Sequence, residues 1–412
     1  MISSFLLFSL LVAAPAPAPA QGIVAIRVGR AESIASGTLE HAVILVEGNT
    51  ITAIGEDLPI EPGIPILDRP DWVVTPGLVN CYSRLGLTSR AGNQFEPHVL
   101  ASQELTEVNS ALGQVLELGV TTLGLVPPGA GITGQAVAIR TKGSKPADLV
   151  LQDRAFLALS LETNSSSKKA LRRGFEGVDD YQGKVDKERA KFDKKNDSKK
   201  SKSKSKDKDE DKDKDEFKPP TPDEKVKPFL DVREGRLSAL VNIRKASDWL
   251  HLRDVISEEK DMRYHLRCPL SDDIDLYEVK DAIGELALHF VTTPTITQQV
   301  GTRRERNLPA ELTTAGAKLV FVPASDSVRS HETYVKEVAY LVSKGLDAEA
   351  AYYGLTLGPA TVLGVEDRVG SLEVGKHANL VLWNGDPFEP GTEIQAVMLE
   401  GAWVHEEDGA TE

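Results

Sequence analysis

Short apolar runs rich in β-branched residues lie near both ends of the chain. They cover Ile23–Val28, Ala42–Val46, Ile51–Ile54, Asn379–Trp383 and Ile394–Leu399. Runs of this length, bounded by turn-forming residues, are typical of β-strands. Because both ends show the same pattern, the sequence predicts one small β domain that combines residues 23–72 with residues 365–406.

The middle of the chain, residues 73–364, alternates apolar strand-like runs with helical patterns. A helical pattern over Leu105–Leu118 stops at Gly119, and Val120–Val126 follows it as a buried strand candidate. Later strand and helix pairs are Ala239–Ile243 with Trp249–Ile256, and Leu319–Val322 with Tyr334–Ser343. Alternation of this kind predicts parallel strands joined by crossover helices.

One segment, residues 191–216, interrupts this alternation because it is almost entirely Lys, Asp, Ser and Glu. It contains 11 Lys against 9 Asp and Glu, which leaves a net charge of +2. Such a segment cannot bury enough apolar surface to offset the entropy lost on ordering. The sequence predicts a disordered, solvated insertion in preference to a basic arm that binds nucleic acid.

The N-terminus has the pattern of an export signal. Phe5–Ala14 is apolar but too short to span a bilayer as a helix. Ala18-Pro19-Ala20 supplies the small residues that signal peptidases accept. We therefore expect residues 1–20 to be removed and the protein to be exported to the periplasm or outside the cell, with a retained membrane anchor as the alternative. We expect no membrane span after signal removal, because no later segment has 18 uninterrupted apolar residues.

Composition narrows the class of protein further. A length of 412 residues leaves room for one barrel of about 250 residues and a small second domain. The 41% of hydrophobic residues excludes a wholly disordered chain. A net charge of −14 makes nucleic acid an unsuitable partner. The two cysteines, Cys81 and Cys268, are predicted to be buried thiols rather than a disulfide.

Several motifs together resemble the amidohydrolase superfamily, in its imidazolonepropionase-like branch. They are Val74–Asn80, Gly119–Thr122, Gly134-Gln135 and Gly370–Val381. This resemblance implies an α/β fold, a (β/α)8 TIM barrel over residues 73–364 flanked by the β-sandwich from both termini. It also implies hydrolysis of carbon–nitrogen bonds other than peptide bonds, with Zn²⁺ or another divalent metal lowering the pKa of a bound water from about 15.7 to about 7.

In that family two His on the first barrel strand, one His each from the fifth and sixth strands, and an Asp after the eighth strand hold the metal. In this sequence the corresponding positions fall on Tyr82, Arg84, Asn242, the neighbourhood of Cys268 with His265 and Arg267 close by, and Asp326. Only Asp326 matches the expected residue type. Tyr is a poor ligand for Zn²⁺ at neutral pH, and a permanently cationic Arg repels a divalent ion.

These substitutions predict a barrel mouth lined by Tyr82, Arg84, Asn242 and Cys268, with no bound metal or other cofactor. Asp326 is the remaining candidate for an acid or base. A carboxylate that has lost its metal needs another cation, and the first and eighth strands of a barrel are neighbours. We therefore expect the guanidinium of Arg84 to pair with Asp326.

Two classes of function follow. The first is a hydrolase of non-peptide carbon–nitrogen bonds that works with an atypical metal or none. The second is a non-catalytic barrel used as a binding or scaffolding module. General-base help from one Asp supplies about 10²–10⁴-fold, which does not replace a shift of about 9 units in the pKa of water, and this favours the second class. The small-molecule partner is unidentified, and a homo-oligomer is the default assembly.

Overall fold

The computed structural model describes residues 22–87, 95–161, 165–203, 216–271, 274–299 and 301–406. The predicted export signal, residues 1–20, lies outside these described residues. Within them, no helix combines the length and the apolar character needed to cross a membrane.

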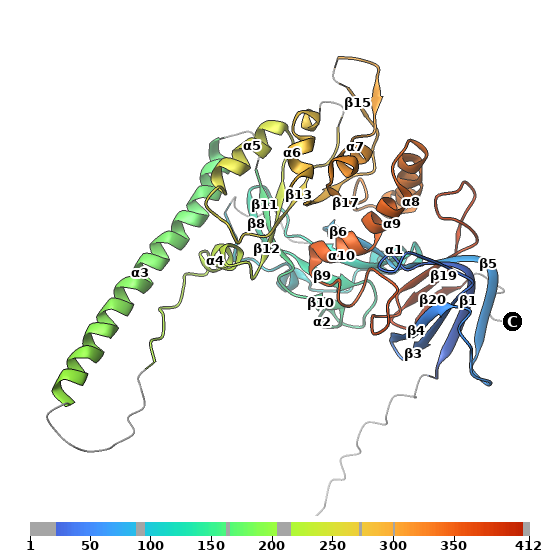
Figure 1. Cartoon of the computed structure of the whole chain (residues 1–412), viewed down its shortest axis with the longest axis horizontal. Helices are drawn as coiled ribbons and strands as arrows, with labels where there is room; N and C mark the ends of the chain where they lie inside the picture. The colour runs from blue at the N-terminus through green and yellow to red at the C-terminus, as the bar shows by residue number, and fades with distance from the viewer. Residues whose placement is uncertain are drawn as a thin grey trace, which may run out of the picture.

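Strands from both ends of the chain form one eight-stranded sheet, in the order β20-β19-β18-β5-β1-β3-β4 with β2 paired to β1. The link between the two ends is the antiparallel pairing of β5 with β18. The strands are β1 (Val24–Glu32), β2 (Thr38–Glu40), β3 (Ala42–Glu47), β4 (Thr50–Glu56), β5 (Ile66–Pro76), β18 (Leu380–Trp383), β19 (Ile394–Leu399) and β20 (Ala402–Glu406). The predicted terminal strands are thus confirmed, and β5 extends four residues beyond the predicted boundary at residue 72 (Figure 1).

The middle of the chain forms a four-stranded sheet, β10-β9-β7-β6, and a six-stranded sheet, β17-β14-β13-β12-β11-β8. The pairings from β11 to β17 and the β6–β7 pairing are parallel, as predicted, whereas β8–β11, β7–β9 and β9–β10 are antiparallel, which corrects the prediction for these strands. These strands are β6 (Leu78–Ser83), β7 (Val120–Leu125), β8 (Ile132–Gln135), β9 (Val137–Arg140), β10 (Val150–Gln152), β11 (Phe156–Ser160), β12 (Ser238–Asn242), β13 (Tyr264–Arg267), β14 (His289–Thr292) and β17 (Lys318–Phe321). A short pair, β15 (Thr297–Gln298) and β16 (Glu305–Arg306), stands apart.

Helices separate the parallel strands, so the predicted pairs β12 with α5 and β17 with α8 are confirmed. The helices are α1 (Ala111–Glu117), α2 (Pro146–Leu149), α3 (Ser165–Ser203), α4 (Lys227–Arg233), α5 (Ala246–Val255), α6 (Lys280–Gly284), α7 (Leu308–Ala315), α8 (Val328–Ser343), α9 (Ala348–Leu355) and α10 (Leu357–Leu363). The prediction of a helix from Leu105 was wrong. The helix starts at Ala111, just after a local turn in which the side chain of Asn109 accepts a hydrogen bond from the Ala111 N–H at 2.9 Å.

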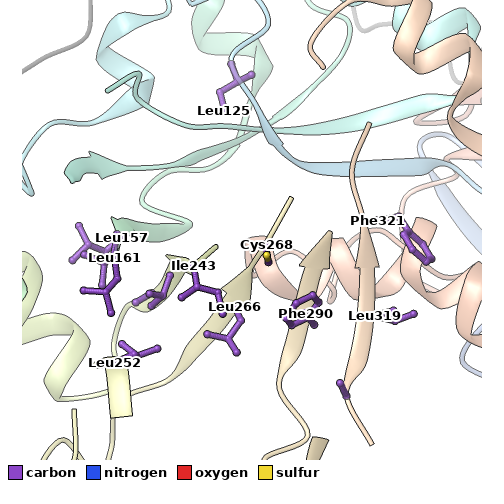
Figure 2. Packing of buried hydrophobic residues seen from close by; sticks show 14 of the residues in the cluster. Leu125, Leu157, Leu161, Ile243, Leu252, Leu266, Cys268, Phe290, Leu319 and Phe321 are labelled. Atoms are coloured by element: carbon purple, nitrogen blue, oxygen red, sulfur yellow. The ribbon is translucent and has the colours of Figure 1, made fainter. Parts of the chain in front are cut away.

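Residues on the parallel strands alternate between two apolar clusters, as the period of two requires. On β12, Ala239 and Val241 belong to the larger cluster beneath the helices, whereas Leu240 belongs to a second cluster. Figure 2 shows the larger cluster, with Leu266 and Phe290 on neighbouring strands. The second cluster joins both middle sheets, since it contains Val79 of β6, Ala138 of β9, Phe156 of β11, Leu240 of β12, Val291 of β14 and Val320 of β17.

The Lys/Asp-rich insertion is not disordered throughout, which corrects the prediction for residues 191–216. Its first part, to Ser203, is the end of the 39-residue helix α3, which projects away from the rest of the chain (Figure 1). Lys is a good helix former, and extending an existing helix needs no new nucleus. Lys191 also pairs with Glu188 one turn away, at 2.8 Å. Residues 204–215 lie outside the described residues.

Candidate functional site

A cavity of about 430 Å³ lies where the parallel strands end. Asn242 is the last residue of β12, Arg267 is the last residue of β13, and Asp326 follows β17. Among the predicted site residues, Tyr82, Arg84, Asn242 and Asp326 all line this cavity. The other lining residues are Gly129, Ala130, Gly131, Thr133, Ala158, Leu159, Ser160, Leu240, Arg244, Arg267, Pro269, Pro323, Ala324 and Ser325.

The ends of β12 and β13 place an amide beside a guanidinium. Asn242 and Arg267 are partners in the parallel register of these strands. Nη1 of Arg267 donates a hydrogen bond to Oδ1 of Asn242 at 2.9 Å. The amide nitrogen of Asn242 is 3.5 Å from Oγ of Ser160 on the next strand, β11. Register therefore connects three adjacent strand ends in one polar row along the cavity.

Tyr82, near the end of β6, supports the same guanidinium from another side. The guanidinium carbon of Arg267 lies 3.7 Å from the centre of the Tyr82 ring. This stacking favours the cation electrostatically and holds its plane in place. Nε of Arg267 is buried and has no hydrogen-bond partner among the described residues. The edge of the guanidinium that carries Nε thus lacks a protein partner in the described part of the chain.

Asp326 is held by β6, but the predicted ion pair with the Arg84 guanidinium is not found among the described ion pairs. Oδ1 of Asp326 accepts hydrogen bonds from Oγ of Ser83 at 2.6 Å and from the backbone N–H of Arg84 at 3.1 Å. The expectation was wrong about the donor, because a backbone N–H and a hydroxyl already satisfy this oxygen. Nε of Arg84 is buried without a hydrogen bond to any described residue.

Cys268 does not line the cavity, which corrects its predicted role. It follows Arg267 directly, so the strand period of two turns it to the opposite face. Cys268 is completely buried in the larger apolar cluster, near Leu266 and Phe290 (Figure 2). Burial raises the pKa of its thiol to about 12, so it stays protonated at neutral pH. Of these two neighbours, Arg267 is the one that lines the cavity.

The two cysteines are free and buried, as predicted. Burial raises the pKa of the Cys81 thiol to about 12 as well. Neither thiol is activated as a nucleophile, since activation requires a lowered pKa and access.

The histidines do not enter the cavity lining. His331 on α8 is buried, and burial lowers its pKa. His265 and His289 lie on adjacent strands with ring centres 5.0 Å apart, a proximity that the sequence spacing did not show. Burial lowers the pKa of His265 to about 3 and that of His289 to about 4, so both are neutral at pH 7. Among the described residues, no group of three or more His, Cys, Asp or Glu could hold a metal ion.

Sequence reasoning missed three polar residues of this site. Arg244 lines the cavity two residues after Asn242, and Ser160 lines it at the end of β11. Ser83 fixes Asp326 from β6. Strand alternation would have favoured Arg267 over Cys268, because Arg267 pairs with Asn242 in register. Nothing in the sequence pointed to Ser83, whose role depends on contact between segments about 240 residues apart.

Comparison with known proteins gives a consistent result. Residues 244–404 match the model of the amidohydrolase family. A 39-residue stretch is 59% identical to the imidazolonepropionase of Shewanella oneidensis, and this match spans about a tenth of each chain. The chain thus aligns with about a tenth of the length of the curated relatives it matches.

Solved structures resemble the chain over nearly its whole length. The amidohydrolase from Thermotoga maritima covers 93% of this chain and 100% of its own, with a TM-score of 0.69 and 22% identity. A Xaa-Pro dipeptidase with bound methionine covers 94% of this chain and 100% of its own, with a TM-score of 0.55 and 14% identity. These likenesses show a shared α/β fold with a β-rich second part. The family match is confined to residues 244–404, and the solved structures add a likeness of fold over the rest of the chain.

Proposed function

We propose that this protein binds a small molecule in the cavity at the strand ends and does so without a divalent metal. The observation that carries the proposal is the set of side chains at the expected ligand positions. Tyr82, Arg84, Asn242 and Arg267 line the cavity, and Asp326 is the single carboxylate among the described residues that line it. Divalent zinc needs His, Cys or carboxylate ligands.

These residues do not fit a divalent ion. A guanidinium is a permanent cation without an acceptor atom, so it can only repel a metal. Oδ1 of Asp326 already accepts two hydrogen bonds, from Ser83 and from the backbone of Arg84. The Asn242 carbonyl oxygen accepts a hydrogen bond from Arg267. No step of a reaction is therefore assigned to a metal here.

We also propose that the two middle sheets close into one barrel and that the terminal sheet forms a sandwich. The support for the barrel is the cluster shared by strands of both sheets and the hydrogen bond from Ser83 on β6 to Asp326 after β17. The support for the sandwich is a second shared core, with Ile26 and Ile44 from the N-terminal strands and Leu380 and Met398 from the C-terminal strands.

The experiment is a metal analysis of the full chain beside a variant in which Tyr82, Arg84, Asn242 and Arg267 are all replaced by His. The wild-type protein is expected to hold less than about 0.1 equivalent of zinc, iron or manganese, whereas the four-His variant gains up to one equivalent. Circular dichroism confirms that the variant is folded. Stoichiometric metal in the wild-type protein contradicts the proposal.

A second candidate is metal-free hydrolysis of a carbon–nitrogen bond, and one observation favours it. Asp326 lines the cavity at the position where the superfamily has its acid, and its carboxylate is fixed by Ser83 at 2.6 Å. As a general base it would supply about 10²–10⁴-fold. An assay of cyclic amides and Xaa-Pro dipeptides tests this candidate: turnover that falls at least about 100-fold in D326N supports it, and no turnover in the wild-type protein rejects it.

A further inference from the structure

Two guanidiniums face the cavity without a carboxylate partner among the described residues. Arg84 and Arg267 both line the cavity, and neither forms an ion pair with any described residue. In both residues Nε is buried and makes no hydrogen bond to the described part of the chain. A buried donor without a partner costs about 1–3 kcal/mol, and more when the group is charged. The two cations therefore meet the cavity with no carboxylate of the described residues paired to them, and an anionic ligand would supply that charge.

We infer that the ligand of this cavity is a small organic acid whose carboxylate is bound by Arg84 and Arg267. The inference rests on the proposed metal-free binding function and names the class of ligand for it. A carboxylate matches the planar fork of a guanidinium with two parallel hydrogen bonds. A cationic ligand would instead meet like charge from the arginines of the lining.

The guanidinium of Arg267 is held in a fixed orientation before any ligand binds. Its Nη1 donates a hydrogen bond to Oδ1 of Asn242 at 2.9 Å. Its guanidinium carbon lies 3.7 Å from the centre of the Tyr82 ring, on which it stacks. These two contacts fix the guanidinium at the cavity wall, where no carboxylate of the described residues is paired with it. A fixed side chain loses less entropy when the ligand arrives, which strengthens binding.

Arg84 is fixed through its backbone instead of its side chain. Its N–H donates to Asp326 at 3.1 Å, so the residue is positioned by the same carboxylate that Ser83 holds. Asp326 thereby serves the site as a positioning residue, and one of its oxygens is already occupied. The remainder of an acid would meet apolar lining at Leu159 and Pro323.

The experiment is titration calorimetry on the full chain with pairs of acids and their neutral counterparts. Benzoate is compared with benzamide and succinate with succinamide, and inorganic phosphate is a separate arm because phosphate offers the same acceptor geometry. We expect at least one of the acids to bind at least tenfold more tightly than its amide. R84Q and R267Q should each weaken that acid at least tenfold and leave the amide unchanged.

Two matched variants control for charge and for folding. R27Q removes an exposed arginine that pairs with Asp68, and it should leave acid binding unchanged. R267K keeps the positive charge but lacks the fork, so it should restore part of the affinity lost in R267Q. A melting curve for each variant verifies that it is folded.

The outcomes separate this inference from the proposed function. Amides that bind as tightly as their acids, acids that bind equally well to R84Q and R267Q, or phosphate alone binding would overturn the carboxylate assignment while leaving metal-free binding intact. Failure of every acid to bind also overturns the assignment. Stoichiometric metal in the wild-type protein contradicts the proposed function itself, whatever the acids do.

Discussion

Arginines occur in two polar regions of this protein. In one region they are paired with carboxylates, and in the other most of them are not. In the first, which we term the α4 ion-pair cluster, Arg154, Arg233 and Arg236 meet Asp231 and Glu259. Arg233 donates to both oxygens of Glu259 at 2.7 Å. Among the described residues that line the cavity, by contrast, guanidiniums outnumber the single carboxylate, Asp326. The first arrangement stabilises the fold. In the second, Arg84 and Arg267 have no carboxylate partner among the described residues.

The pKa of Asp231 shows how complete the first arrangement is. Burial acts to raise that pKa, but hydrogen bonds from Arg154 and Arg236 outweigh it and hold the pKa below its usual value. Asp231 is nearly fully buried, at 4% exposure. Paired charges of this kind are costly to break, because the partner is left buried and alone.

The largest effect is expected from breaking the α4 ion-pair cluster with R233M. This change leaves Glu259, whose side chain is only 7% exposed, without its bidentate partner. We expect a loss of about 3 kcal/mol in the free energy of unfolding, measured by urea denaturation. R27M, at an exposed ion pair, serves as the control and should change stability by less than about 0.5 kcal/mol. Equal effects of the two substitutions would contradict the contrast.

A smaller effect is expected from D231N, and it should depend on pH. The folded state holds the pKa of Asp231 below the unfolded value of about 3.9, so the unfolded chain takes up the proton first as pH falls. The stabilisation by Asp231 is therefore complete above about pH 5 and is lost as pH falls through the folded pKa. Urea denaturation of wild type and D231N at pH 7, 5 and 3 should show a gap of about 2 kcal/mol that narrows only at pH 3. A gap that widens at pH 3 would reverse the sign of this argument.

The smallest effect is expected in the cavity, where R84M should leave the ligand-free protein unchanged or stabilise it by up to about 1 kcal/mol. The substitution removes a buried Nε that has no partner among the described residues. Sites that sacrifice stability for binding commonly gain stability when they are disabled. Melting temperatures of R84M and R233M, measured without ligand, give the direct comparison. A loss in R84M as large as that in R233M would show that Arg84 is structural.

Much of the fold was predictable because its signals are local. β-branched runs identified β1, β3, β4, β18 and β19, and the family motifs identified their neighbours. The insertion was harder, because Lys-rich composition is shared by disordered segments and by solvated helices, and only continuity with the helix before it distinguishes the two.

Which of the candidate residues line the cavity was predictable to within one residue of register. Tyr82, Arg84, Asn242 and Asp326 do come together, whereas Cys268 was chosen where its neighbour Arg267 faces the cavity. A shift of one residue on a strand exchanges its two faces, so a small alignment error becomes a complete change of environment. The donor to Asp326 was beyond sequence reasoning, since Arg84 contributes its backbone there and its side chain elsewhere.

The outward course of helix α3 limits the electrostatic effect of its lysines on the cavity. Beyond Tyr181 the helix continues to Ser203, which at about 1.5 Å per residue carries its lysines about 30 Å outward. At physiological ionic strength the field of a charge fades over about 8 Å. Lys194 and Lys195 therefore lie about 20 Å beyond Tyr181, more than two of these screening lengths, and contribute little to the potential at the strand ends, where arginines line the cavity. Shortening helix α3 from its Ser203 end is therefore expected to leave the attraction of anions to the cavity unchanged.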